Sequence, residues 1–154
     1  MLLNIKKRNA ATRQIKKAQS QEYGSSIEFL RNKQLPAEDI DTNKIRFFIS
    51  FTENEIAGTI GLEIYESIAL LRSMATDPVY RNRGVAPSLL EALIEYAKKK
   101  EVKELYLLTE TAEAFFHKRG FLKINREEAP QEIKQSTEVS HICSFSVVLM
   151  KKEI

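Results

Sequence analysis

The chain has 154 residues, 43% of them hydrophobic, and a formal charge of +3 at pH 7. This length predicts one domain with a full core, and the mild charge does not indicate a nucleic-acid-binding protein. One cysteine, Cys143, excludes an internal disulfide and favours a reducing compartment. Because no apolar run suits a membrane-spanning helix or a signal peptide, we expect a cytoplasmic protein without a membrane partner.

The first third of the chain predicts a strand and a helix. Residues 1–12 are expected to form a solvated N-terminal extension, and one domain is expected to cover residues 13–154. A strand over Arg13–Ala18 is followed by a helix from Ser20 or Gln21 to about Asn32, which Leu35-Pro36 ends. Residues 39–43 are expected to form a polar turn or a short helix.

Three strands are predicted next, over residues 45–52, 56–65 and 68–76. Two-residue turns, Glu53-Asn54 and Glu66-Ser67, separate them. Gly58 and Gly61 weaken the middle strand, because glycine has no side chain to pack. This part of the chain therefore predicts two successive hairpins.

Helices and strands alternate in the second half. The predicted elements are a helix over Pro87–Lys100, a strand over Leu105–Thr109, a helix from a Thr111 cap to Arg119 with Gly120 after its end, a strand over Phe121–Ile124, a helix over Glu128–Gln135 and a strand over Ser144–Lys151. Hairpins followed by alternating helices and strands predict an α/β domain with a mixed sheet.

A glycine-containing loop, Arg81-Asn82-Arg83-Gly84-Val85-Ala86, lies between the strand over 68–76 and the following helix. Such a loop presents backbone N–H groups at a helix N-terminus, where anions bind. Gly84 allows an anion to approach the backbone closely, and the two arginines can contact further phosphate oxygens. The loop therefore indicates a phosphate-binding site.

This loop resembles the Arg/Gln-x-x-Gly-x-Gly/Ala pyrophosphate loop of the GNAT superfamily of N-acetyltransferases. The segments Tyr106–Thr109 and Phe116–Phe121 follow at the family's distances, and the resemblance covers about residues 13–151. It implies a mostly antiparallel sheet of six to seven strands, splayed between the fourth and fifth strands, with flanking helices. It also implies acetyl-CoA as acyl donor and no metal.

Longer motifs resemble the arsenic-resistance N-acetyltransferases. These motifs are Ala69–Ser73, Leu105–Thr109, Thr111–Phe116, Gly120-Phe121, Pro130–Thr137 and Cys143. The Thr-Ala-x-x-Phe-Phe run is also similar to the acetyltransferase domain of N-acetylglutamate synthases. Both resemblances imply an acceptor of the α-amino acid type, and the first suggests an arsenical or phosphinate analogue.

The GNAT resemblance also implies the contacts with acetyl-CoA. The backbone of the fourth strand would bond to the pantetheine arm, and the N–H of Met74 would donate to the thioester carbonyl as a catalytic group. The residues expected to contact acetyl-CoA are Met74, Ala75, Thr76, Arg81, Asn82, Arg83, Gly84, Val85, Ala86, Ser88, Thr111 and Phe116.

Two positions depart from the family pattern. Pro87, which has no N–H, stands where the family often has Ser or Thr, and Ser88 would partly replace the missing phosphate contact. Phe116 stands where many members have a Tyr that reprotonates the CoA thiolate. The acid is therefore another group, a water, or absent.

The acceptor side is assigned to Glu63, Arg72 and Thr109. If Glu66-Ser67 is a two-residue turn, then Glu63, Arg72 and Met74 share one face of the sheet. Arg72 would hold the acceptor carboxylate, and Glu63 would steer or deprotonate the ammonium as a catalytic residue. The alternative is a cross-strand ion pair with no catalytic task.

These features together predict an acetyl-CoA-dependent N-acetyltransferase that acts on a small amine acceptor by direct transfer in a ternary complex. The alternatives are a peptide or protein N-acetyltransferase and a catalytically weak acetyl-CoA-binding sensor. No nucleic-acid partner is expected, and the protein is expected to be a monomer or a homodimer.

Overall fold

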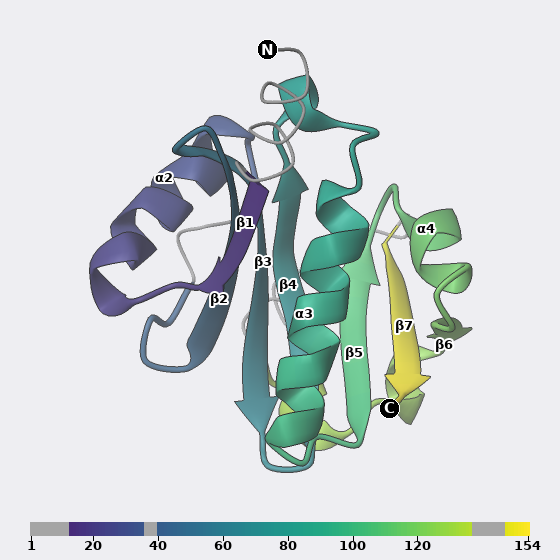
Figure 1. The fold of residues 1–154 in the computed structure, drawn as a ribbon. Helices are drawn as coiled ribbons and strands as arrows, with labels where there is room; N and C mark the ends of the chain where they lie inside the picture. The colour runs from purple at the N-terminus through teal and green to yellow at the C-terminus, as the bar shows by residue number, and fades with distance from the viewer. Residues whose placement is uncertain (1–12, 36–39, 137–146) are drawn as a thin grey trace. The chain divides into compact units, whose positions relative to one another are not determined.

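The structure is a computed structural model that describes residues 13–35, 40–136 and 147–154 (Figure 1). Its strands are β1 (Arg13–Lys17), β2 (Ile45–Thr52), β3 (Glu55–Tyr65), β4 (Ile68–Thr76), β5 (Glu104–Thr109), β6 (Leu122–Ile124) and β7 (Val148–Glu153). Its helices are η1 (Ser20–Glu22), α2 (Tyr23–Asn32), η2 (Pro78–Tyr80), α3 (Val85–Lys99), α4 (Glu113–His117), η3 (Arg126–Glu128) and α5 (Gln131–Lys134).

The described strands form a seven-stranded sheet in the order β1-β2-β3-β4-β5-β7-β6. β4 and β5 pair in parallel, whereas β1 with β2, β5 with β7 and β6 with β7 pair antiparallel. The predicted α/β class with a mixed, mostly antiparallel sheet is therefore confirmed.

The chain divides into two compact units, each built from two stretches of sequence. The first unit contains the residues up to Gly61 together with Ser73–Glu95, and the second contains Leu62–Arg72 together with Tyr96–Ile154. β3, β4 and α3 each contribute to both units. The two units are described separately below.

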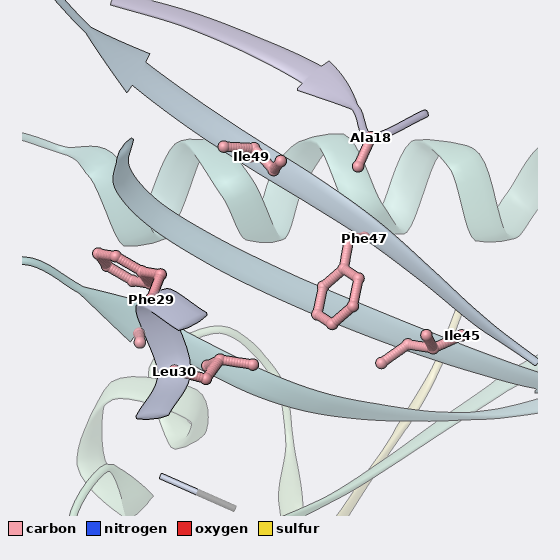
Figure 2. Packing of buried hydrophobic residues seen from close by; sticks show 7 residues of the cluster. Ala18, Phe29, Leu30, Ile45, Phe47 and Ile49 are labelled. Atoms are coloured by element: carbon pink, nitrogen blue, oxygen red, sulfur yellow. The ribbon is translucent and has the colours of Figure 1, made fainter. Parts of the chain in front are cut away.

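The core of the first unit lies between α2 and the first strands. Its buried members are Ala18, Phe29, Leu30, Ile45, Phe47, Ile49 and Ala75. Figure 2 shows Phe29 and Leu30 of α2 gathered with Ile45 and Phe47 of β2. The Tyr23 ring packs edge-on against Phe47 at 5.5 Å between centroids, so the apolar face of the predicted helix is the one that it buries.

Two short turns join β2 to β3 and β3 to β4, as the sequence predicts. Glu53 and Asn54 have φ of 54° and 67°, which is the left-handed pair of a type I′ hairpin turn. Glu66 has φ of 59°. Neither turn contains glycine, so hairpin pairing holds non-glycine residues in a conformation that they rarely adopt.

In the second unit, β4 pairs with β5 from Ile68↔Glu104 to Leu71↔Leu107. This register stops there although both strands continue, in keeping with the splayed fourth and fifth strands of the GNAT resemblance. The second unit also contains a cluster of buried hydrophobic residues, made up of Ile68, Leu70, Tyr106, Ala129, Ile133 and Leu149.

Several predicted boundaries shift in the structure. α3 begins at Val85 and not at Pro87. Gly84, the residue before it, has a positive φ of 80°, which a right-handed helix does not allow. α4 covers only Glu113–His117 and its N-cap is Ala112, not Thr111. α5 follows Pro130, which lies before the helix and not in its first turn.

β7 extends to Glu153, beyond the predicted end at Lys151. Residues 1–12, Pro36, Ser144 and Cys143 lie outside the described residues. None of the helices in the described ranges is long and apolar enough to cross a membrane.

Candidate functional site

A backbone irregularity in β4 lies next to the residues expected to contact the acyl group. Ser73 has φ of 59° in the middle of the strand, a conformation that costs a non-glycine residue free energy and that is typical of bulges and functional sites. The Thr59 Oγ1 donates to the Ser73 carbonyl at 3.0 Å, and Thr59 is fully buried. The strand is therefore held out of regular geometry just before Met74.

This irregularity corrects one step of the sequence argument. Side chains alternate between faces only along a regular strand, and Ser73 interrupts β4 between Arg72 and Met74. Arg72 and Met74 therefore cannot be assigned to one face by alternation. The assignment of the Met74 N–H as a donor does not depend on the face, so it stays a prediction.

Gly58 of β3 allows the start of α3 to approach the sheet. A Cβ added at Gly58 would lie 2.8 Å from the Ala75 carbonyl oxygen, 2.8 Å from Val85 Cγ1 and 3.1 Å from Leu89 Cδ1. Real Cβ atoms do not reach the shorter of these distances, so α3 or β4 would have to move. From its sequence context, Gly58 was expected only to weaken the strand, although an isolated glycine in a strand also indicates close approach of another backbone.

The predicted phosphate loop has the geometry of an anion-binding turn. Asn82 and Gly84 have φ of 61° and 80°, and left-handed residues in a turn direct successive N–H groups to one side. The Ser88 N–H already donates to the Gly84 carbonyl at 3.2 Å. The N–H groups of Val85 and Ala86 lie in the first turn of α3, where a helix has no acceptors of its own.

The side chains that flank this turn are positive. Arg81 and Arg83 are exposed, and the Arg83 guanidinium lies over the Tyr80 ring at 5.8 Å. The turn thus combines backbone donors, a helix N-terminus and two cations, which together suit a pyrophosphate. Ser88 is partly buried and follows Pro87, the residue that cannot donate.

Three hydrogen bonds hold the segment before the loop. Asp77 accepts from the Val79 N–H at 3.0 Å and from Lys33 Nζ at 3.1 Å, and these bonds lower the pKa of the Asp77 carboxyl. The Tyr80 hydroxyl donates to Glu55 at 3.2 Å, and burial together with this carboxylate raises the pKa of Tyr80. β4 and α3 are therefore joined by an anchored connection.

Glu63, Arg72 and Tyr65 form a buried polar cluster in the second unit. Arg72 Nη1 donates to Glu63 Oε1 at 3.0 Å, and the Tyr65 hydroxyl donates to Glu63 Oε2 at 2.7 Å. The side chains of Arg72 and Glu63 are only 1% and 5% exposed. The structure thus brings Glu63 and Arg72 together as expected, and it adds Tyr65, which the sequence analysis missed although it lies two residues after Glu63 on the same strand.

The remaining predicted residues also belong to the second unit. Thr109 Oγ1 accepts from the Ala112 N–H at 2.9 Å, so Thr109 holds the start of α4, the task that the sequence had given to Thr111. Thr111 is exposed. Phe116 is buried, and its ring packs edge-on against Phe115 at 5.1 Å and Phe121 at 5.3 Å.

Comparison with known proteins identifies the family. The model of the acetyltransferase (GNAT) family matches residues 11–121. The chain belongs to this family. An uncharacterized N-acetyltransferase from Chlorobaculum tepidum is 28% identical over 88 residues, which are 56% of this chain and 56% of that protein. The match therefore spans little more than half the length of this GNAT relative.

Solved structures share the fold. N-acetylglutamate synthase from Neisseria gonorrhoeae, complexed with coenzyme A and L-arginine, superposes with a TM-score of 0.75 at 16% identity, over 93% of this chain and 33% of that one. PaiA N-acetyltransferase from Thermoplasma acidophilum, in complex with coenzyme A, superposes with a TM-score of 0.68 at 18% sequence identity. The match covers 92% of this chain and 99% of that one. A GNAT acetyltransferase from Staphylococcus aureus Mu50 superposes with a TM-score of 0.71 at 22% sequence identity. This match covers 92% of this chain and 98% of that one.

Proposed function

We propose that this GNAT-family chain transfers the acetyl group of acetyl-CoA to the amine of a small, amino-acid-like acceptor in a ternary complex. The observation that carries the proposal is the turn before α3, in which Asn82 and Gly84 are both left-handed and Arg81 and Arg83 flank the donors. Coenzyme A is present in several solved neighbours, which supports acetyl-CoA as the donor. Since one cysteine leaves no internal disulfide, we place the activity in the cytoplasm.

Acetyl-CoA would lie with its pyrophosphate on the turn of residues 81–86. The expected contacts with the acyl end are the backbone of Met74, Ala75 and Thr76, which follow directly after Ser73. In the reaction, the lone pair of the neutral amine attacks the thioester carbonyl carbon, and the C–S bond breaks. CoA leaves as a thiolate, and the nitrogen releases one proton to this thiolate or to water. The N–H of Met74 would stabilise the charge on the carbonyl oxygen, and Thr111 and Phe116 stay expected contacts of the donor.

On the acceptor side, we propose that Arg72 recognises a carboxylate. Arg72 Nη1 is held by Glu63 Oε1, so an acceptor carboxylate would compete with Glu63 for this nitrogen. The released Glu63 could then accept the ammonium proton, while its other oxygen stays on Tyr65. Thr109 would complete the acceptor side. The likeness to N-acetylglutamate synthase supports an α-amino acid acceptor, and an arsenical or phosphinate analogue is the finer variant of the same proposal.

Two assays test the donor and the acceptor separately. Calorimetry should give a dissociation constant for acetyl-CoA in the micromolar range, which corresponds to a binding free energy of about −8 kcal/mol. Arg83→Glu should weaken the affinity for acetyl-CoA at least tenfold. Lys123→Glu makes the same charge change on exposed β6 and should leave the affinity unchanged. Equal affinity of both variants would contradict the assignment of the loop.

The acceptor assay measures release of free CoA. Glutamate-like amino acids and their phosphinate and arsenical analogues are each compared with the corresponding decarboxylated amine. Arg72→Lys should raise the acceptor KM by roughly tenfold, because lysine lacks the planar fork of arginine. Equal rates with the decarboxylated amines would show that Arg72 and Glu63 form only a structural ion pair.

A second candidate is an acetyl-CoA-binding sensor with little turnover. Phe116 favours it, because this side chain cannot reprotonate the CoA thiolate and is packed between two other phenylalanines. Tight acetyl-CoA binding with no CoA release from any acceptor, peptide amines included, would support the sensor.

A further inference from the structure

The first unit contains a pocket at the end of the β1–β2 pair where β1 stops and β2 begins. It has a volume of about 780 Å³ and is lined by residues that include Lys17, Gln19, Ser20, Tyr23, Asn43 and Arg46. This volume is within the usual range for small-molecule sites. None of these residues belongs to the proposed acetyl-CoA or acceptor sites.

The lining of this pocket is positive. Its nine lining residues include two cations, Lys17 and Arg46, and no carboxylate. Strand register explains why both cations face the same way. Lys17 is the partner of Phe48 across the pair, and Arg46 lies two residues from Phe48, so the two charges project from one face of the ladder.

The charge of Arg46 is not neutralised by a carboxylate in the part of the chain that the structure describes. Its Nη1 donates to the carbonyl oxygens of Asn43, at 3.4 Å, and Ile45, at 3.1 Å. Carbonyl oxygens orient a guanidinium but leave its net charge in place. The side chain is thus positioned at the pocket and keeps the charge that attracts an anion.

Two carboxylates of the first unit, Glu22 and Asp41, bind other groups. Glu22 binds Lys16 Nζ at 2.8 Å and accepts from the Gln19 N–H at 2.9 Å. Asp41 accepts from the Asn43 N–H at 2.9 Å. Glu22 thus pairs with Lys16, which lies outside the pocket lining.

The uncharged lining includes side chains that can donate hydrogen bonds. The hydroxyl of Ser20 and the side-chain amides of Gln21 and Asn43 line the same pocket. Gln21 Nε2 donates to Gln19 Oε1 at 2.8 Å, so the Gln19 acceptor is used inside the lining. Donors around two cations are complementary to an oxyanion, because each oxygen accepts several hydrogen bonds.

We propose that this pocket binds a small oxyanion ligand, through the phosphate or carboxylate group of a metabolite, at a site separate from the acetyl-CoA loop. The proposal does not depend on the acetyltransferase reaction. It predicts that inorganic phosphate or acetate binds here when the loop is filled with coenzyme A.

The test is an NMR titration of the full chain labelled with ¹⁵N, at constant ionic strength, with and without saturating coenzyme A. Inorganic phosphate and acetate are added separately. The amides of residues 17–23 and 42–46 should shift along a saturable curve. A response to phosphate alone identifies a phosphorylated ligand, and a response to acetate alone identifies a carboxylate. Shifts confined to residues 81–86, or lost when coenzyme A is present, would overturn the proposal.

Substitutions make the test specific. Arg46→Gln and the nearly isosteric Asn43→Asp should each weaken binding at least fivefold, whereas Lys123→Gln on β6 should leave it unchanged. Equal dissociation constants in all three variants would mean that the ions act only by screening, which contradicts a site. If Arg46→Gln fails a thermal-unfolding check, Asn43→Asp and Lys17→Gln decide the outcome.

Discussion

Thr59 of β3 binds the main-chain oxygen of Ser73 in β4 through its hydroxyl, at 3.0 Å. This contact joins a fully buried side chain to the left-handed residue that interrupts β4. The residues expected to contact the acyl end of acetyl-CoA come directly after it. A local backbone conformation and the proposed chemistry are thus linked through one hydrogen bond.

The first prediction concerns this bond. Thr59→Val keeps the shape of the side chain but leaves the Ser73 carbonyl without its donor. We expect a loss of about 1–2 kcal/mol in the free energy of unfolding and a fall in the rate of CoA release, because β4 can relax toward regular geometry. Urea unfolding and the CoA-release assay measure the two effects. Thr59→Ser, which keeps the hydroxyl, is the control, and equal activity of both variants would disconnect the bond from the site.

The second prediction concerns the approach of α3 to the sheet. In Gly58→Ala the new Cβ meets Ala75 and Val85 at 2.8 Å, so the loop before α3 must shift. We expect at least a tenfold loss of acetyl-CoA affinity by calorimetry. Gly24→Ala is the matched control, because nothing lies within 4 Å of its added Cβ, and alanine in α2 should raise stability by up to about 1 kcal/mol. Unchanged affinity in Gly58→Ala would rule out this packing role.

The third prediction concerns the buried ion pair. Glu63→Gln leaves the Arg72 charge without its carboxylate, and removal of one partner of such a pair costs about 3–5 kcal/mol. The double variant Glu63→Gln/Arg72→Met should lose less than the sum of the single variants, since no charge is then left uncompensated. Urea unfolding of all four proteins gives the coupling energy. Strict additivity would mean that the two side chains do not interact in solution.

The fourth prediction concerns pH. The Val79 N–H first, and then Lys33, lower the pKa of Asp77 from its ordinary value of 3.8. A lowered pKa in the folded state adds stability above the unfolded pKa, and this stability is lost as the pH falls through the folded pKa. The stability difference between the natural chain and Asp77→Asn should therefore be constant above about pH 5 and shrink below about pH 4.

Lys33→Met separates the two causes of this pKa shift. Because the Val79 N–H bond is the larger cause, most of the pH dependence should remain in Lys33→Met. Thermal unfolding between pH 3 and pH 7 measures it. A stability difference for Asp77→Asn that does not change with pH would contradict the Asp77 assignment.

Much of the fold follows from local sequence patterns. β2 and β4 have the predicted bounds, Ile45–Thr52 and Ile68–Thr76, because β-branched and apolar residues fill each run and a turn dipeptide ends it. The alternation of strands and helices is likewise a property of short stretches. The turn at residues 81–86, the proposed phosphate loop, was predictable for the same reason, since a strand, Gly84 and a helix are adjacent in the chain.

The tertiary structure alone decided the details of the site. The left-handed φ of Ser73 has no sequence signal, because serine does not favour it, and the hydrogen bond from Thr59 of the neighbouring strand supports it. The task of Gly58 depends on Val85, 27 residues later in the chain. Arg72 and Glu63 were predictable as neighbours, but their burial and the contact with Tyr65 depend on how whole strands pack. The sequence by itself therefore determined where the elements and the loop lie, and long-range packing decided which backbone and side-chain groups the site can offer.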